Sequence, residues 1–379
     1  MSQTGKPPFR ADQVGSMIRP DHLVAARVAF DRDELHAEEL HRIEDEEIRK
    51  AVALQERIGF EVVTDGEFRR ESWNRDFLLK FDNVVLGPSR IALEYNTAGG
   101  GKAERVPTAL AITGKIGRSQ PIFVEHFKFL KSIAQVTPKH VTPKLTIPSP
   151  TILHFRGGRE SIDSKAYPEM EAFYADVARV YNEEIGALAA AGCRYLQVDD
   201  VNFAYICDPR VAAQVRAMGE DPDRLPHTYA KLINAAIATR PADMTVGLHV
   251  CRGNAPTGWT EGSYEQVADI LFNEIDVTAY FLEYDSPRAG GFEPLRFLPK
   301  GKTVVLGLVS TKTKELENKD ALKRRIEEAA KHVPLEQLAI STQCGFSSGM
   351  KSAGVRGMTE ADEIAKLSLV VEVAREVWN

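Results

Sequence analysis

The stretch Met244-Thr245-Val246-Gly247-Leu248-His249-Val250-Cys251-Arg252-Gly253-Asn254 contains the unit that recurs along this chain, a short apolar run followed by polar side chains. The apolar run predicts a strand. Side chains alternate along a strand, so His249 and Cys251 should point the same way from its end. An imidazole and a thiolate on one face form half of a tetrahedral zinc site. An isolated His-x-Cys pair is also compatible with two inert buried side chains, so its meaning depends on the rest of the chain.

Short apolar strands of the same kind begin near eight positions, and helical stretches separate most of them: Val14, Val62, Leu145, Leu196, Val246, Phe281, Val304 and Ala339. Alternating strands and helices predict an α/β fold with a parallel sheet. Eight such units suit a (β/α)8 TIM barrel, whose size range reaches ~400 residues with insertions. A doubly wound open sheet is the alternative. It usually has a glycine-rich nucleotide turn after the first strand, and Val14-Gly15-Ser16-Met17-Ile18 is not one.

Residues 81–143 interrupt this regular pattern after the second strand. Ile91-Ala92-Leu93-Glu94-Tyr95 and Ala109-Leu110-Ala111-Ile112-Thr113 indicate a β-hairpin-type excursion, and residues 123–134 predict a helix that ends it. We interpret this segment as an insertion, so residues 1–379 are expected to form one barrel domain.

Composition excludes several classes of protein. The net charge of −6 and the pI of 5.9 argue against nucleic acid as the main partner, because phosphate binding needs a basic surface. No apolar stretch is long enough to span a bilayer, and the N-terminus lacks the apolar core of a signal peptide. We therefore expect a cytoplasmic protein whose partners are small molecules. The sequence leaves the oligomeric state open, a homo-oligomer included.

Four cysteines in 379 residues are no disulfide framework, so they should be free thiols or metal ligands. In a barrel the carboxyl ends of the strands converge on one mouth, which would bring together His249, Cys251, Glu283 and Cys344. Two thiolates and an imidazole favour Zn²⁺ over Mg²⁺ or Ca²⁺, which prefer oxygen ligands. A substrate thiol that replaced the carboxylate would bind as thiolate. The expected chemistry is therefore activation of a thiol.

These residues resemble the catalytic barrel of cobalamin-independent methionine synthase and its shorter single-barrel relatives, over most of the chain outside the insertion. In that family a His-x-Cys pair, a later Glu and a later Cys bind the catalytic zinc, which implies the same role for His249, Cys251, Glu283 and Cys344. The family's Ile-Gly-Ser, which contacts homocysteine, matches Val14-Gly15-Ser16.

Further family motifs match at other strand ends. The Gly-Glu motif matches Gly66-Glu67, and Gln-x-Asp-Glu matches Gln197-Val198-Asp199-Asp200. The resemblance implies that Glu67 and Asp199 bind the substrate ammonium. The segment whose aromatic ring stacks on the pterin matches Thr151-Ile152-Leu153-His154-Phe155, so Phe155 is a candidate methyl-donor contact.

The chain also departs from the family. The full enzyme has a second, N-terminal barrel, for which this chain has no room. The family's proton-donating histidine lies in Asp-Ile-His-Ser after strand seven, where this chain reads Leu308-Val309-Ser310-Thr311-Lys312. No catalytic general acid is therefore assigned. Tyr205 replaces an acid near the pterin and is a second candidate contact with the methyl donor.

The resemblance implies a zinc-dependent S-methyltransferase that converts homocysteine to methionine, with 5-methyltetrahydrofolate or a methylcobalamin-type carrier as donor. One alternative is alkyl transfer to another thiol such as coenzyme M, for which Arg69, Arg70 and Lys312 could supply positive charge. Trp73 is a further candidate for the substrate wall. A non-catalytic zinc-binding barrel is the alternative from another class. A closed structural site would usually have four Cys or His ligands, which argues against it.

Overall fold

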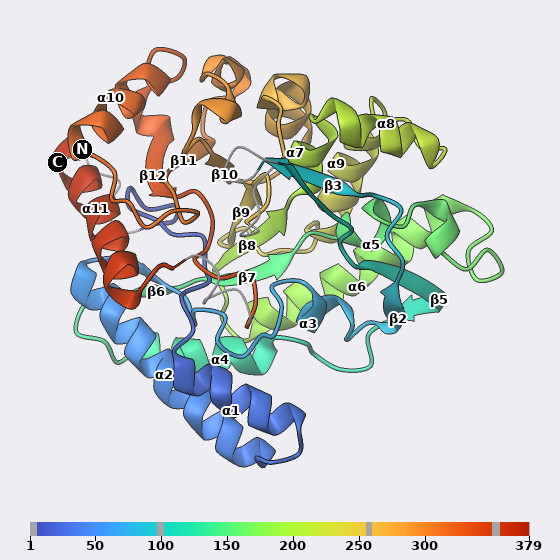
Figure 1. Cartoon of the computed structure of the whole chain (residues 1–379), viewed down its shortest axis with the longest axis horizontal. Helices are drawn as coiled ribbons and strands as arrows, with labels where there is room; N and C mark the ends of the chain where they lie inside the picture. The colour runs from blue at the N-terminus through green and yellow to red at the C-terminus, as the bar shows by residue number, and fades with distance from the viewer. Residues whose placement is uncertain (1–5, 97–101, 255–259, 351–356, 379) are drawn as a thin grey trace.

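A parallel sheet forms the centre of the computed structural model, which describes residues 6–96, 102–254, 260–350 and 357–378 (Figure 1). Its six strands follow the order β12-β11-β10-β9-β8-β7. Their bounds are β7 Leu145–Pro148, β8 Tyr195–Asp200, β9 Thr245–Val250, β10 Ala279–Glu283, β11 Thr303–Val309 and β12 Leu338–Thr342. Four of the six are buried along their whole length, as expected of parallel strands covered on both faces.

The register of this sheet brings the polar strand ends to one edge. Asp199 of β8 pairs with His249 of β9, and Glu283 of β10 pairs with Gly307 of β11. Because all neighbouring pairs are parallel, the residues that follow each strand emerge on the same side.

The first two expected strands are shorter than the sequence predicts. β1 is only Val62–Val63 and pairs in parallel with β6, Thr142–Pro143. The strand expected near Val14 is reduced to a single bridge between Ala11 and Ile340 of β12. Side chains take the carbonyl groups that a neighbouring strand would otherwise bind. Lys144 Nζ donates to Gln13 O, Gln197 Nε2 to Val14 O at 2.6 Å and Thr64 Oγ1 to Gly15 O at 2.6 Å.

Helices lie around the strands (Figure 1). Their bounds are α1 Asp21–Asp31, α2 Ala37–Ile58, α3 Arg75–Leu78, α5 Ile152–Phe155, α6 Met170–Ala190, α7 Asn202–Ile206, α8 Pro209–Ala217, α9 Leu225–Ala236, α10 Lys319–Ala329 and α11 Glu360–Trp378. Short 3-10 or π turns are η1 Arg159–Ser161, η2 Tyr264–Gln266, η3 Ile270–Glu274, η4 Pro287–Ala289, η5 Glu293–Phe297 and η6 Leu335–Gln337. The long α2 buries one face, including Ile48 and Val52. It ends at Gly59, whose φ of 112° suits a left-handed helix cap.

Two antiparallel strand pairs and a helix occupy the segment between β1 and β6. β2, Asp82–Gly87, pairs with β5, Ala109–Gly117, and β3, Leu93–Asn96, pairs with β4, Lys102–Arg105. The helix α4 follows at Val124–Ala134. β5 packs against α5 and α6, so this segment lies on the same hydrophobic core as the parallel sheet.

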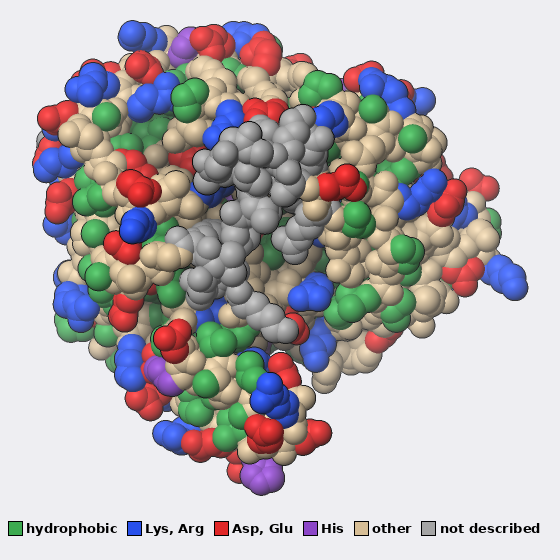
Figure 2. Space-filling view, in the orientation of Figure 1, with side chains coloured by type: hydrophobic (Ala, Val, Ile, Leu, Met, Phe, Trp, Pro, Cys, Tyr) green, Lys and Arg blue, Asp and Glu red, His purple; other side chains and the backbone are tan. Residues whose placement is uncertain are grey.

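Charges of both signs are interspersed among the described residues on the face drawn in Figure 2. In the described part of the chain, no helix combines the length and apolar character that a membrane span requires.

Candidate metal centre

His249, Cys251 and Cys344 come together at the polar edge of the sheet. His249 lies near the end of β9, Cys251 directly follows that strand, and Cys344 lies two residues beyond β12. One ligand atom from each falls within 4.8 Å of the others. His249 is 3% exposed, yet neither of its ring nitrogens has a hydrogen-bond partner. A buried imidazole without partners is costly unless a ligand occupies it, which fits a metal.

One hydrogen bond joins the two sulfurs of this group. The Cys344 thiol donates to Cys251 Sγ over 4.0 Å, and this contact, with the nearby His249, holds the pKa of Cys251 well below its usual range. The same contact and burial raise the pKa of Cys344. This arrangement favours the thiolate form of Cys251 over that of Cys344, and Zn²⁺ would displace the proton of Cys344 on binding. The donor set of one imidazole and two sulfurs fits Zn²⁺.

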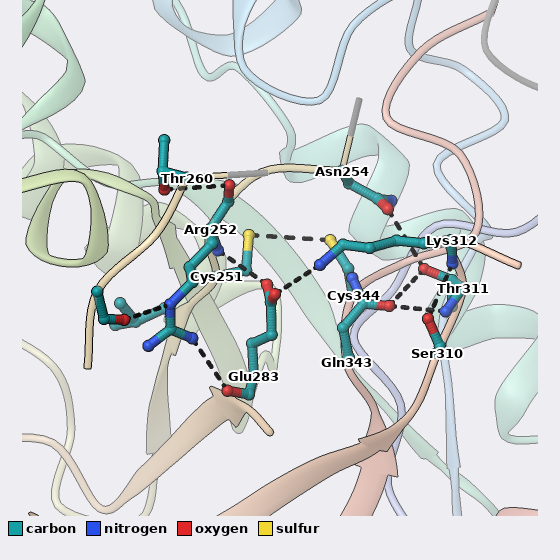
Figure 3. A network of polar contacts seen from close by, with 12 residues as sticks. Cys251, Arg252, Asn254, Thr260, Glu283, Ser310, Thr311, Lys312, Gln343 and Cys344 are labelled. Carbon is teal, nitrogen blue, oxygen red and sulfur yellow. Dashed lines mark hydrogen bonds and ion pairs between the residues drawn. The ribbon is translucent and has the colours of Figure 1, made fainter. Parts of the chain in front are cut away.

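Glu283, the expected fourth ligand, ends β10 beside this group but binds other residues (Figure 3). Its Oε1 lies 2.5 Å from Lys312 Nζ, and its Oε2 accepts the Arg252 backbone N–H at 2.8 Å. Burial favours the neutral carboxyl, but Lys312 and Arg252 outweigh it and lower the pKa of Glu283. The carboxylate thus stays charged within reach of the sulfur pair.

A network of side chains joins the two turns that carry the cysteines (Figure 3). Asn254 Nδ2 donates to Gly345 O at 2.6 Å. Thr311 Oγ1 donates to Gln343 Oε1 at 2.8 Å, and the Thr311 backbone N–H donates to the same oxygen at 2.7 Å. The roles of Asn254, Thr311 and Gln343 could not be predicted from the sequence, because polar residues in a turn give no sign of which other turn they will bind.

A cavity of about 410 Å³ opens onto this group. It is lined by His249, Cys251 and Cys344 together with four of the expected substrate residues: Val14, Ser16, Glu67 and Asp199. The fifth, Gly15, lies directly beneath. A Cβ there would sit 2.7 Å from Thr146 Cγ2 and 3.3 Å from Glu67 Oε1, and its φ of 142° disfavours any other residue.

Two buried carboxylates face this cavity. Glu67 Oε1 accepts from Thr146 Oγ1 at 2.8 Å, while its Oε2 has no hydrogen-bond partner despite burial. Asp199 Oδ1 accepts from Gln197 Nε2 at 2.7 Å. Burial, together with the charge of Glu67, raises the pKa of Asp199 to about 7. Two acids of this kind suit a cationic group, which would satisfy the unpaired oxygen and favour the ionised form of Asp199.

A buried lysine fixes the orientation of Gln197. Lys144 Nζ is fully buried and donates to Gln197 Oε1 at 3.1 Å and to Asp12 Oδ1 at 2.7 Å. Because an ammonium only donates, the amide oxygen must face Lys144, and the amide NH₂ must face Asp199 and Val14 O. These contacts among buried side chains were not predicted from the sequence.

Aromatic and apolar side chains also line the cavity. Trp73 and Tyr205 line it, as do residues between β1 and β6 that the sequence did not assign to the site: Leu86, Pro107, Thr108, Ala109 and Leu110. Phe155 is buried and does not line the cavity; its ring centroid lies 6.4 Å from that of Tyr205.

Arg69 and Arg70, two of the candidate cations, do not line the cavity. Arg69 pairs with Glu44 at 3.1 Å, and Arg70 Nη2 donates to Thr146 O at 2.7 Å beneath the cavity. Cys193 and Cys207 are buried, and burial raises the pKa of each to about 12. Both are thus neutral thiols, as expected of small buried hydrophobic residues.

Residues 9–376 match the model of the cobalamin-independent synthase catalytic domain. The chain belongs to the cobalamin-independent methionine synthase family. It is 43% identical to the uncharacterized protein YxjG of Bacillus subtilis over 379 residues, which cover 100% of this chain and 97% of that protein. It is 27% identical to a methionine synthase of Pyrococcus abyssi, with 81% of this chain and 80% of that protein covered.

A solved structure from the cobalamin-independent methionine synthase family has the same architecture. It is the crystal structure of a Listeria monocytogenes protein provisionally named a vitamin-B12-independent methionine synthase, 36% identical to this chain with a TM-score of 0.77. The similarity covers 99% of this chain and 100% of that one. The α/β fold with its parallel sheet is therefore the fold of this family.

Proposed function

We propose that the protein is a zinc-dependent methyltransferase that methylates a thiol, homocysteine, to give methionine. The observation that carries this proposal is one cavity lined by a His-Cys-Cys group and by two buried carboxylates, Glu67 and Asp199. A thiol bound at the sulfur pair would place its amino group toward the acids. Family membership and the names of relatives such as the Pyrococcus enzyme support the same reaction.

We further propose that His249, Cys251 and Cys344 would hold Zn²⁺, with Glu283 as a replaceable fourth ligand. Bound zinc would lower the pKa of a coordinated thiol, so that the substrate reacts as thiolate. The contacts of Asn254 with Gly345, and of Thr311 with Asn254 and Gly345, hold the two sulfur-bearing turns together. Positioning and desolvation would then supply much of the rate.

We assign the methyl donor to the aromatic and apolar side chains of the cavity. Tyr205 and Trp73 line it, and the Phe155 ring packs against Tyr205 at a centroid distance of 6.4 Å. A flat ring such as that of 5-methyltetrahydrofolate suits such walls, and a methylcobalamin-type carrier is the other candidate. No residue is assigned as general acid. We infer that the fold is a single (β/α)8 barrel over residues 1–379 with an insertion at about 81–143 that supplies part of the cavity wall.

Zinc K-edge X-ray absorption with and without homocysteine tests the proposal. Two sulfur ligands should become three when homocysteine is added. A zinc coordination shell that homocysteine leaves unchanged would point to a different substrate thiol or to a structural metal. Absence of zinc would refute the metal site. An assay of methionine formation with 5-methyltetrahydrofolate and with methylcobalamin would then identify the donor.

Glu67 and Asp199 also distinguish between thiols. A sulfonate thiol such as coenzyme M needs positive charge, whereas Glu67 and Asp199, two buried acids of the cavity wall, suit the ammonium group of an amino-acid thiol. Arg69, one of the cations that kept this alternative open, is paired with Glu44 and does not line the cavity.

A further inference from the structure

An ion pair between Lys312 and Glu283 lies beside the proposed metal ligands Cys251 and Cys344. Lys312 lies three residues beyond β11, and Glu283 is the last residue of β10. Lys312 Nζ lies 2.5 Å from Glu283 Oε1, and the two side chains are 7% and 2% exposed (Figure 3). A charge pair this buried is costly to separate, because each charge would lose its counterion without gaining water.

Both oxygens of the Glu283 carboxylate already have partners in the protein. Lys312 holds Oε1, and the Arg252 backbone N–H holds Oε2 at 2.8 Å. Among the described residues, the group whose ligand atoms converge contains His249, Cys251 and Cys344 without Glu283. Glu283 can therefore join a metal there only by moving from its present position, in which it is bound to Lys312 and to the Arg252 backbone.

The position of Lys312 is tied to that of Cys344. The preceding Thr311 donates through both its backbone N–H and its hydroxyl to Gln343 Oε1, and its hydroxyl also contacts Gly345 O at 3.1 Å. Gln343 and Gly345 flank Cys344 in the chain. The contacts of Thr311 therefore fix the position of the neighbouring Lys312 relative to Cys344. The Lys312 ammonium group points toward Glu283 (Figure 3).

We propose that Lys312 is a positioning residue that competes with the metal for the Glu283 carboxylate and so keeps the fourth ligand position open to the substrate thiol. This inference rests on the proposed function. With zinc held by His249, Cys251 and Cys344, the substrate thiol would lose its proton to solvent and its thiolate would take the fourth position, while Glu283 would stay paired with Lys312. The charge balances, since the thiolate is the anionic fourth ligand and Lys312 neutralises the Glu283 carboxylate.

A double-mutant cycle on zinc affinity tests this role. The apo protein is titrated with zinc against a chelator of known affinity, as wild type, K312M, E283Q and K312M/E283Q. Without Lys312, Glu283 is free to ligate, so K312M should bind zinc roughly tenfold more tightly, and E283Q should remove that gain. E283Q alone should change the affinity far less than it does in the K312M background. K312R, which keeps the charge, is the matched control and should stay near wild type.

Homocysteine binding to the zinc-loaded proteins gives a second readout. K312M should bind homocysteine about tenfold more weakly by calorimetry, because Glu283 then resists displacement. A merely structural ion pair would leave both affinities unchanged or lower the zinc affinity, and either result overturns the inference. A wild type that binds no zinc would refute the proposed function itself. If K312M fails to fold, a crystal structure of the zinc- and homocysteine-bound wild type decides, with Glu283 on Lys312 expected and Glu283 on zinc contradicting it.

Discussion

Cys251 Sγ and Cys344 Sγ lie 4.0 Å apart, although the two residues are 93 positions apart in the chain. They follow two different strands of one parallel sheet, β9 and β12, and the Asn254 contact with Gly345 joins their turns at 2.6 Å. The separation of the sulfurs is therefore set by protein contacts, which is the preorganisation that a metal centre needs.

Cys344→Ser should abolish stoichiometric zinc binding together with activity. A serine hydroxyl is a far poorer zinc ligand than a thiolate, so the affinity should fall by more than the roughly 100-fold that loss of an outer contact can cost. Metal content by mass spectrometry of the purified variant measures this. Cys193→Ser is the control, because the buried Cys193 only donates to Tyr195 O at 3.5 Å. Zinc retained at wild-type affinity in Cys344→Ser would contradict the assignment.

Asp199→Asn should keep zinc but weaken homocysteine binding. The carboxylate faces the cavity beside Glu67, and its loss removes one charged partner of the substrate ammonium. Such a contact contributes about 1.5–3 kcal/mol, or roughly 10–150-fold in affinity. Calorimetry on the zinc-loaded variant measures the change. A homocysteine analogue without the amino group is the matched control ligand, and its affinity should be nearly the same for wild type and variant. An equal loss for both ligands would argue against an ammonium site at Asp199.

The sequence was most informative where chemistry and periodicity coincide. The apolar run before His249 predicted β9, and the alternation of side chains correctly predicted that His249 and Cys251 would lie close together. The expected helix at the end of residues 81–143 is present as α4. These features depend on residues close together in sequence, which is what local patterns encode.

The sequence was least informative where a side chain far along the chain binds a group that a neighbouring strand would otherwise bind. The strand expected near Val14 is nearly absent, because Lys144, Gln197 and Thr64 bind the carbonyl groups of this segment. The pairing of Glu283 with Lys312 likewise depends on where two separate turns meet. The role of Leu110 in the cavity wall depends on how β5 packs. Tertiary contacts of this kind have no local pattern.

Gly345→Ala should displace Ser16 and weaken homocysteine binding. A Cβ on Gly345 would lie 2.0 Å from Ser16 Oγ and 3.0 Å from Ser16 N, and Ser16 is held in place by the donation of Phe346 N to its carbonyl at 2.8 Å. Overpacking of this kind costs about 1–3 kcal/mol of unfolding free energy. Urea unfolding and homocysteine calorimetry measure the two effects.

Ser16→Gly in the Gly345→Ala background separates the two effects. Removing the Ser16 side chain relieves the close contact with its hydroxyl but leaves the one with its backbone N, so most of the unfolding free energy should recover. Homocysteine affinity should stay low, because the hydroxyl that lines the cavity is gone. If the unfolding free energy and the homocysteine affinity both recovered, Ser16 would have no role in substrate binding beyond packing.

Glu363 is a buried carboxyl at the start of α11 and is remote from the cysteines in the chain. Its Oε1 accepts the Ile18 backbone N–H at 2.9 Å. Burial, with a smaller effect of the Glu360 charge, raises the pKa of Glu363 from 4.5 to about 8. The unfolded chain therefore releases this proton at lower pH than the folded protein, and the unfolding free energy falls as pH rises from about 5 to 8.

Glu363→Gln should therefore stabilise the protein at alkaline pH. Glutamine keeps an acceptor for Ile18 N–H but carries no charge to bury, so the gain should be on the order of 2–4 kcal/mol at pH about 9 and small near pH about 5. Urea unfolding at both pH values measures it. Glu360→Gln is the control on the same turn: Glu360 is exposed, so its substitution should produce no comparable pH-dependent gain. An equal change at both pH values in Glu363→Gln would mean that packing, and not the proton, is responsible.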